Sequence, residues 1–310
     1  MPINEELSRL LSPKDTALTV GIFDGVHLGH KYLLSQLIEQ AERQNLLSAV
    51  VTFFPHPLKL LESDSKLLYL TDLEKKKALL KKEGADNIIV LPFSRELARL
   101  SAREFAGMLK EYLKMKVLVL GTGATLGNNR EGDTATLSKM GKEMGFTLID
   151  VPPITINGET VSSTAVRQAL VDGDLIKADR LLGRPFDISG IVSCGTGTGA
   201  SLNYPTANLK IDPEQALPTE GVYATRAYIG DKKYQSVTNI GRRPTFGSKF
   251  VTIEVHILGF QGNLYGQELK IDIIERIRSE IKFDSASELK KQISRDIETG
   301  KAILNRENGE

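Results

Sequence analysis

The segment ALTVGIFDGVHLGHKYLLSQL, residues 17–37, joins a short apolar run to a stretch with leucines at helical spacing. Glycines, among them Gly21 and Gly25, separate the two parts, and two of the chain's four histidines, His27 and His30, lie three residues apart in between. This pattern predicts a buried strand, a glycine-rich turn and an amphipathic helix. Glycines let a backbone approach a phosphate closely, and the start of a helix attracts an anion. The segment therefore predicts an α/β domain with an anion site at this turn.

The same alternation continues outward over the first half of the chain, from Leu18 to about Val151. Strands that alternate with helices form a parallel sheet with helices on both faces, and such a sheet binds its ligand at the carboxyl ends of the strands. We therefore expect a doubly wound α/β domain over residues 1–183. Its expected strands are LTVGIF (18–23), LSAVVTFF (47–54), NIIVLPF (87–93), KVLVLG (116–121) and FTLIDV (146–151).

The pattern changes in residues 184–310, where short segments alternate Thr, Val, Ile and Tyr and are separated by glycines. Such segments are typical of antiparallel sheets or small barrels. A closing amphipathic stretch, residues 285–304, begins with serine caps and predicts a helix against the barrel. The expected strands are DISGIVSCG (187–195), GVYATRAYIG (221–230), KKYQSVTNIG (232–241), VTIEVHILGF (251–260) and LKIDIIERIR (269–278).

Charge and cysteine content exclude several classes of protein. The net charge of +1 argues against nucleic-acid or membrane-surface partners, which need a basic excess. A local basic cluster, Lys75, Lys76 and Lys77, is followed closely by Leu79 and Leu80. This mixture of lysines and leucines favours a solvated helix face over a basic binding patch. The lone cysteine, Cys194, has no disulfide partner and fits a reducing compartment. With no signal peptide and no apolar stretch of ~20 residues, we expect a cytoplasmic protein.

The spacing of His27 and His30 lets both imidazoles project from the first helical turn toward one point. Two rings there can donate hydrogen bonds to the negative charge that builds on an α-phosphate during in-line attack. Two plainer interpretations remain. The histidines can be surface or capping residues, or they can bind a metal, although no Cys, Asp or Glu stands at ligand spacing to complete a zinc site.

GIFDGVHLGH, residues 21–30, resembles the signature of the HxGH nucleotidyltransferases. Its Phe-Asp-Gly form is similar to the adenylyltransferase domain of prokaryotic bifunctional riboflavin kinase/FAD synthetases, which implies a Rossmann-like fold. TFFPHP (52–57) and SSTAVR (162–167) also match that family, although SSTAVR alone would make an ordinary N-cap with a surface arginine. The resemblance implies transition-state stabilisation by His27 and His30. It implies nucleotide contacts from Gly21, Phe23, Asp24, Gly25, His56, Ser162, Ser163, Thr164 and Arg167.

One stretch departs from the family. In GTGATLGNNREGD, residues 121–133, Gly123, Ala124 and Leu126 occupy positions where the family has a polar side chain and two aromatic ones. A glycine supplies neither a hydrogen bond nor a stacking face. Two hypotheses stay open for this half: an adenylyltransferase with a differently organised pocket, or a degenerate nucleotide-binding domain.

A second glycine-rich loop, GTGTGASLNYPTAN, spans residues 195–208. It is no dinucleotide fingerprint, because Pro205 follows too soon for a helix, and a flexible hairpin is the default interpretation. On an extended strand, however, Thr206 and Asn208 point to one face, and their oxygens suit Mg²⁺.

This loop closely resembles the riboflavin kinase signature, Pro-Thr-Ala-Asn behind a glycine-rich phosphate loop. The resemblance implies a six-stranded antiparallel β-barrel with a terminal helix, and the family's further landmarks continue to about Ile303. It makes Glu254, in IEVHIL (253–258), the base for the ribityl 5′-hydroxyl. Asn203 replaces a common glycine, and we expect it to adopt the left-handed conformation. Implied phosphate contacts are Gly195, Gly197 and Gly199, implied metal ligands are Thr206 and Asn208, and implied flavin contacts are Arg278 and Phe283.

We therefore expect a two-domain enzyme that phosphorylates riboflavin with ATP and Mg²⁺ to give FMN, then adenylylates FMN with ATP to give FAD and pyrophosphate. The first alternative is a riboflavin kinase with a degenerate adenylyltransferase domain. The second is a flavin- or nucleotide-binding regulator without turnover.

Overall fold

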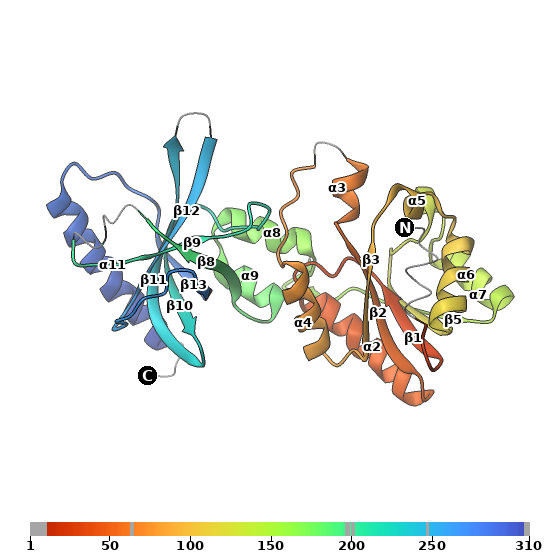
Figure 1. The fold of residues 1–310 in the computed structure, drawn as a ribbon. Coiled ribbons are helices and arrows are strands. Elements are labelled where there is room, and N and C mark those ends of the chain that lie inside the picture. The colour runs from red at the N-terminus through yellow and green to blue at the C-terminus, as the bar shows by residue number, and fades with distance from the viewer. Residues whose placement is uncertain (1–10, 63–64, 196–198, 200–201, 246–247, 307–310) are drawn as a thin grey trace. The chain divides into compact units, whose positions relative to one another are not determined.

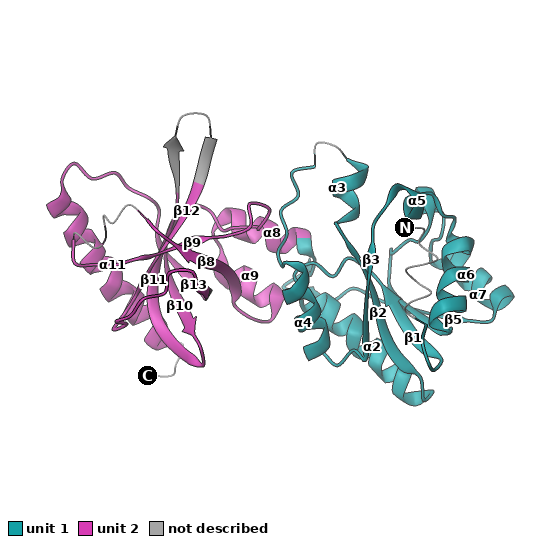
Figure 2. Ribbon diagram, viewed as in Figure 1, with its two compact units in different colours: residues 1–163 teal, residues 164–310 magenta. Residues whose placement is uncertain are grey.

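The computed structural model describes residues 11–62, 65–195, 199, 202–245 and 248–306 (Figure 1). The chain forms two compact units, unit 1 with residues 1–163 and unit 2 with residues 164–310 (Figure 2). Among the described residues, no helix is long and apolar enough to span a membrane.

Unit 1 is built on a five-stranded sheet in the order β3-β2-β1-β4-β5, with every neighbouring pair parallel. The predicted parallel sheet is therefore confirmed. Strand order reverses at β1, so that β2 and β4 flank it, and a ligand crevice is expected where the connections leave the carboxyl ends of β1 and β4. The strands are β1 (Thr16–Val20), β2 (Leu47–Phe54), β3 (Asn87–Pro92), β4 (Met115–Gly121) and β5 (Thr147–Val151).

Helices cover both faces of this sheet, because neighbouring side chains of β1 pack into two different core clusters. Ala17 belongs to a cluster with Leu34 of α2 and Leu80 of α4, whereas Leu18 belongs to another with Leu109 of α6 and Leu137 of α7. The doubly wound, Rossmann-like architecture is thereby confirmed. The helices are α2 (Leu28–Arg43), α3 (Pro57–Leu61), α4 (Leu73–Lys82), α5 (Arg95–Arg99), α6 (Ala102–Leu113) and α7 (Thr134–Met144).

Smaller elements complete unit 1 and lead into unit 2. A 3-10 turn, η1 (Asn128–Arg130), follows β4, and a short hairpin joins β6 (Thr155–Ile156) to β7 (Glu159–Thr160). Helix α8 (Ser163–Asp172) begins at the last residue of unit 1, and α9 (Leu175–Leu182) lies in unit 2.

Unit 2 is a closed antiparallel barrel of six strands in the order β10-β11-β12-β9-β8-β13. The expected six-stranded barrel is confirmed. The strands are β8 (Phe186–Ser193), β9 (Ala207–Lys210), β10 (Gly221–Ile229), β11 (Lys232–Thr245), β12 (Ser248–Ile257) and β13 (Glu268–Arg278).

The predicted terminal helix is α11 (Ala286–Arg306), which packs against β10, β11 and β13. Ser285 caps it, because its hydroxyl accepts a hydrogen bond from the Glu288 amide. The apolar face of the helix buries Ile303 and Leu304 against Ala224 and Ile274. The terminal helix thus forms one wall of the barrel unit.

We expect Leu304→Ala to lower the free energy of unfolding of unit 2 by about 2–5 kcal/mol, because it leaves a cavity beneath α11 where the side chain is fully buried. Ile176→Ala, at a side chain that is 58% exposed, is the control and should stay within about 0.5 kcal/mol. Urea unfolding of the full chain measures both, and equal effects would contradict the packing.

Candidate functional site

The turn after β1 brings His27 and His30 together. His27 is the N-cap of α2 and its Nδ1 accepts a hydrogen bond from the His30 amide at 3.3 Å. The two rings stack with centroids 3.6 Å apart and an angle of 16° between their planes. His27 therefore caps the helix and at the same time holds the second imidazole beside its own.

Backbone geometry and a buried carboxylate hold this turn. Phe23 and Gly25 have positive φ angles of 53° and 82°, and the Phe23 ring lies 5.1 Å from the His30 ring. Asp24 is 2% exposed and accepts hydrogen bonds from the amides of Leu70 and Thr71, each at 3.1 Å. Asp24 therefore anchors the segment before α4 to the turn.

The prediction that Lys75, Lys76 and Lys77 form a solvated helix face is wrong for Lys76. Its side chain is on the buried side of α4, and the residue is only 5% exposed. Its ammonium donates to the carbonyls of Ile22 (3.2 Å) and Phe53 (3.3 Å) and to the hydroxyl of Thr52 (3.2 Å). The signal was present, because Lys76 lies three residues after Leu73 and four before Leu80, on the apolar face.

The electrostatics of the turn keep His30 neutral. Burial of its ring, then the neighbouring His27 and then the Lys76 ammonium hold the pKa of His30 well below its usual value of 6.5. Burial likewise lowers the pKa of Lys76, against an opposing effect of Asp24. Among the described residues, Nδ1 of His30 finds no hydrogen-bond partner.

Within unit 1, Ser163 of the segment SSTAVR contacts this turn. The Ser163 hydroxyl donates to the backbone carbonyl of Asp24 at 2.8 Å. Ser162 is half-buried beside it in the chain, whereas Thr164 and Arg167 belong to unit 2. The shared phosphate contact of all four residues stays a prediction.

His56 has a local role that the sequence did not suggest. It is the N-cap of α3, where its Nδ1 accepts from the Leu58 amide at 3.1 Å. Its own amide donates to the Tyr69 hydroxyl at 3.0 Å. The nucleotide contact expected of His56 also stays a prediction.

Gly123, Ala124 and Leu126, the residues that differ from the family pattern, lie in the loop after β4. Leu126 is 7% exposed and, with Ala124, joins the cluster beneath α6 and α7. Gly123 has a φ of 83°, and a Cβ built on it would meet no atom within 4 Å. The loop thus fills the core with its small apolar side chains and leaves room around Gly123.

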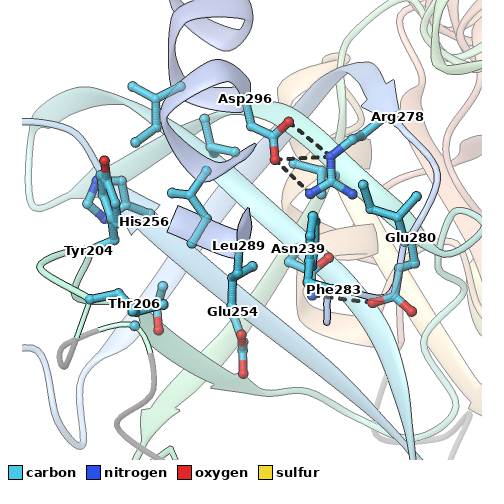
Figure 3. A pocket seen from close by; sticks show the side chains of 17 residues that line it. Tyr204, Thr206, Asn239, Glu254, His256, Arg278, Glu280, Phe283, Leu289 and Asp296 are labelled. Carbon is cyan, nitrogen blue, oxygen red and sulfur yellow. Dashed lines mark hydrogen bonds and ion pairs between the residues drawn. The ribbon is translucent and has the colours of Figure 1, made fainter. Parts of the chain in front are cut away.

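In unit 2, strand register gathers the second set of residues. Glu254 of β12 pairs directly with Asn208 of β9 and, on its other side, with Asn239 of β11. Directly paired residues project to the same face of a sheet. Glu254, Asn239 and Thr206 line a cavity of about 300 Å³ between the barrel and α11 (Figure 3).

The glycine loop packs against Thr206 and Asn208. A Cβ built on Gly195 would overlap the Asn208 amide, and one on Gly199 would lie 3.2 Å from the Thr206 hydroxyl oxygen. Any larger residue at Gly195 would displace Asn208. Gly197 lies outside the described residues. Asn203 has a φ of 66°, as expected from its replacement of a glycine.

An ion pair closes another side of the large cavity (Figure 3). Arg278 at the end of β13 donates to both carboxylate oxygens of Asp296 on α11, the shortest distance being 2.7 Å. Gln292 also donates to Asp296, at 2.8 Å. Phe283 lines the cavity with its ring 5.9 Å from the Arg278 guanidinium carbon. Sequence reasoning missed Asp296, which lies 18 residues from its partner on another element.

Thr206 also lines a second cavity of about 160 Å³, which has aromatic walls from Phe260 and Tyr265 and a polar group from Asn263. The two cavities therefore share Thr206, the residue directly before β9. Its hydroxyl and the Asn208 amide are the oxygen groups that Mg²⁺ accepts beside phosphates and water. The donor types of these two side chains fit such a cation.

Two family models match the chain: the FAD synthetase model over residues 10–165 and the riboflavin kinase model over residues 182–304. Residues 166–181 lie between the matched ranges, and the boundary expected at 183/184 stays a prediction.

Similar proteins cover most of the chain. The bifunctional riboflavin kinase/FMN adenylyltransferase of Escherichia coli (strain K12) is 40% identical over 289 residues, which are 93% of this chain and 92% of the relative. That of Bacillus subtilis (strain 168) is 35% identical over 286 residues, 91% and 90% of the two chains. A crystal structure titled macrolide-efflux protein from Streptococcus pneumoniae has a TM-score of 0.89 and 31% identity, and covers 95% of this chain and 96% of its own.

The low pKa of His30 predicts how the stability of unit 1 varies with pH. Well above pH 6.5 the ring is neutral in both states, so it contributes no pH dependence. Below 6.5 the unfolded chain binds a proton that native His30 does not. The free energy of unfolding should therefore fall with decreasing pH, by up to about 1.4 kcal/mol per unit, until the native pKa is reached.

Denaturant unfolding of the full chain between pH 5 and 7.5 measures this slope. His30→Asn should flatten it, whereas His256→Asn, in unit 2, should leave the transition of unit 1 unchanged. An identical slope for unit 1 in the wild type and His30→Asn would refute the buried neutral ring.

Proposed function

The chain belongs to the family of bifunctional riboflavin kinase/FMN adenylyltransferases, and from that premise we propose which residues carry each reaction. The enzyme phosphorylates riboflavin with ATP to give FMN, and it transfers AMP from ATP to FMN to give FAD and pyrophosphate. The observation that carries the kinase assignment is the register that sets Glu254 opposite Asn208 beside the large cavity.

Glu254 is the base of the kinase reaction. Its carboxylate accepts the proton of the riboflavin 5′-hydroxyl. The freed oxygen forms a bond to the γ-phosphorus as the bond to the bridging β-γ oxygen breaks, and ADP leaves. Leu289 and Ile293 of α11 line the cavity opposite this strand and supply apolar walls for the isoalloxazine ring.

The smaller cavity holds the nucleoside of ATP. Its aromatic residues, Phe260 and Tyr265, offer stacking faces to a purine. Thr206 borders both cavities, so a triphosphate chain that passes Thr206 leads its γ-phosphate toward Glu254. The backbone around Gly195 and Gly199 is free to approach those phosphates.

Thr206 and Asn208 would hold Mg²⁺ together with the phosphates. The cation would neutralise the charge that develops on the phosphate oxygens. In the described part of the chain, no group of three or more His, Cys, Asp or Glu could hold a metal.

His27 and His30 stabilise the adenylyl-transfer transition state. The FMN phosphate attacks the α-phosphorus of ATP, pyrophosphate leaves, and negative charge builds on the α-phosphate oxygens. Each imidazole can donate a hydrogen bond to that charge. Their position at the start of α2, where backbone amides favour anions, supports this role.

The alternative of a degenerate adenylyltransferase domain rested on Gly123, Ala124 and Leu126. The FAD synthetase match and the bifunctional relatives favour activity. The packing of Ala124 and Leu126 in the core supports an intact frame, with space beside Gly123 for part of the flavin. The lone, exposed Cys194 supports a cytoplasmic location.

Glu254→Gln should lower kcat for FMN formation by about 10²- to 10⁴-fold, because the amide cannot accept the proton. The Kd for ATP and the formation of FAD from added FMN should not change. Glu268→Gln, at an exposed glutamate of β13, is the matched control. Initial rates from riboflavin measure the effect, and wild-type turnover of Glu254→Gln would rule out the base.

His30→Ala should lower the rate of FAD formation from FMN by about 10²- to 10³-fold and leave FMN formation from riboflavin unchanged. Chromatography of flavin products from each starting flavin makes the comparison within one protein. Wild-type enzyme that forms FMN but no FAD would contradict the bifunctional assignment, and a fully active His30→Ala would contradict the role of His30 alone.

A further inference from the structure

Lys76 is a buried cation whose hydrogen-bond acceptors in the described structure are all neutral. Its ammonium bonds to Ile22, Thr52 and Phe53, of which Thr52 and Phe53 lie at the end of β2 and Ile22 follows β1. Removing an ammonium from water costs free energy, and a neutral donor would make these contacts at lower cost. Linking the ends of β1 and β2 therefore does not by itself explain why a charged side chain is buried at this position.

We propose that Lys76 is a positioning residue of the adenylyl-transfer site, whose ammonium holds the end of β2 against the turn that carries His27 and His30. The proposal rests on the role assigned to these histidines above. Ile22 directly precedes Phe23, whose positive φ turns the chain and whose ring lies against His30. A shift of the Ile22 carbonyl would therefore move the histidine pair.

The charge of Lys76 adds an electrostatic effect to this tie. The groups that act on His30 are His27 on its own helix start and Lys76 from α4, while Asp24 of the turn acts on Lys76. The Asp24 carboxylate is already engaged by the backbone amides of Leu70 and Thr71. The positive charge of Lys76 disfavours protonation of His30 and attracts the anionic substrate.

The kinetic test compares Lys76→Met with Lys76→Arg, which keeps the charge, in the full chain. Lys76→Met should lower kcat for FAD formation by about 10- to 100-fold with a smaller change in KM for ATP. Lys76→Arg should recover part of kcat, and FMN formation should be unchanged in both. Lys77→Met, next to it and paired with Glu74 at the surface, should match the wild type.

An NMR titration of the histidines distinguishes a positioning role of Lys76 from a purely structural one. In Lys76→Met the pKa of His30 should rise toward its usual value, and in Lys76→Arg it should stay low. A folded Lys76→Met with unchanged His30 pKa and unchanged kcat overturns the proposal. If His30→Ala still makes FAD, the proposed role of His30 fails, whereas the titration still tests the effect of Lys76.

Thr52→Val keeps the test decisive if Lys76→Met does not fold. It removes one acceptor of the ammonium and retains the charge. We expect a reduced kcat for FAD formation, with the pKa of His30 still low and FMN formation unaltered. If Thr52→Val keeps the wild-type kcat and the NMR chemical shifts of His30 do not change, the proposed positioning role of Lys76 is overturned.

Discussion

The antiparallel register of β9 and β12 is the constraint on which the chemistry of the barrel depends. It sets Glu254 opposite Asn208 and, through β11, opposite Asn239, so three polar side chains share one face. A slip of one residue would turn Glu254 to the other face and bring Val255 in its place. The close approach of Gly195 to Asn208 fixes the same arrangement from the loop side. Register and glycine packing together make a site where phosphate, cation and carboxylate can meet.

Unit 1 also positions its candidate site residues through its strands, but its sheet is parallel. Its parallel strands end at one edge, and the turn after β1 lies beside the reversal of strand order. Buried charges hold that turn: Asp24 from within it and Lys76 from α4. The pKa of His30 is held low, and its ring stacks on that of His27. Both sites thus combine the ends or pairing of strands, which are rigid, with glycine-containing turns, which allow close approach to phosphate.

The fold could be predicted from local patterns, and the same patterns propose candidate residues for the two sites. Alternating periods of strand and helix predict the doubly wound unit, and the two-residue period places Thr206 with Asn208. The partners of these residues could not be predicted, because they depend on how separate elements pack. The pairing of Arg278 with Asp296 joins β13 to α11, and the inward position of Lys76 depends on which face of α4 meets the sheet. The sequence indicated the burial of Lys76 through its spacing, because it lies four residues before Leu80 on the same face of the helix.

The central claim is that the Glu254–Asn208 register builds a single phosphoryl-transfer site. A crystal structure of the full chain with riboflavin, Mg²⁺ and a non-hydrolysable ATP analogue tests it most directly. We expect the oxygens of Thr206 and Asn208 at about 2.1 Å from the cation, and the Glu254 carboxylate within hydrogen-bond distance of the flavin 5′-hydroxyl. A cation bound away from both residues, or a 5′-hydroxyl out of reach of Glu254, would contradict the claim.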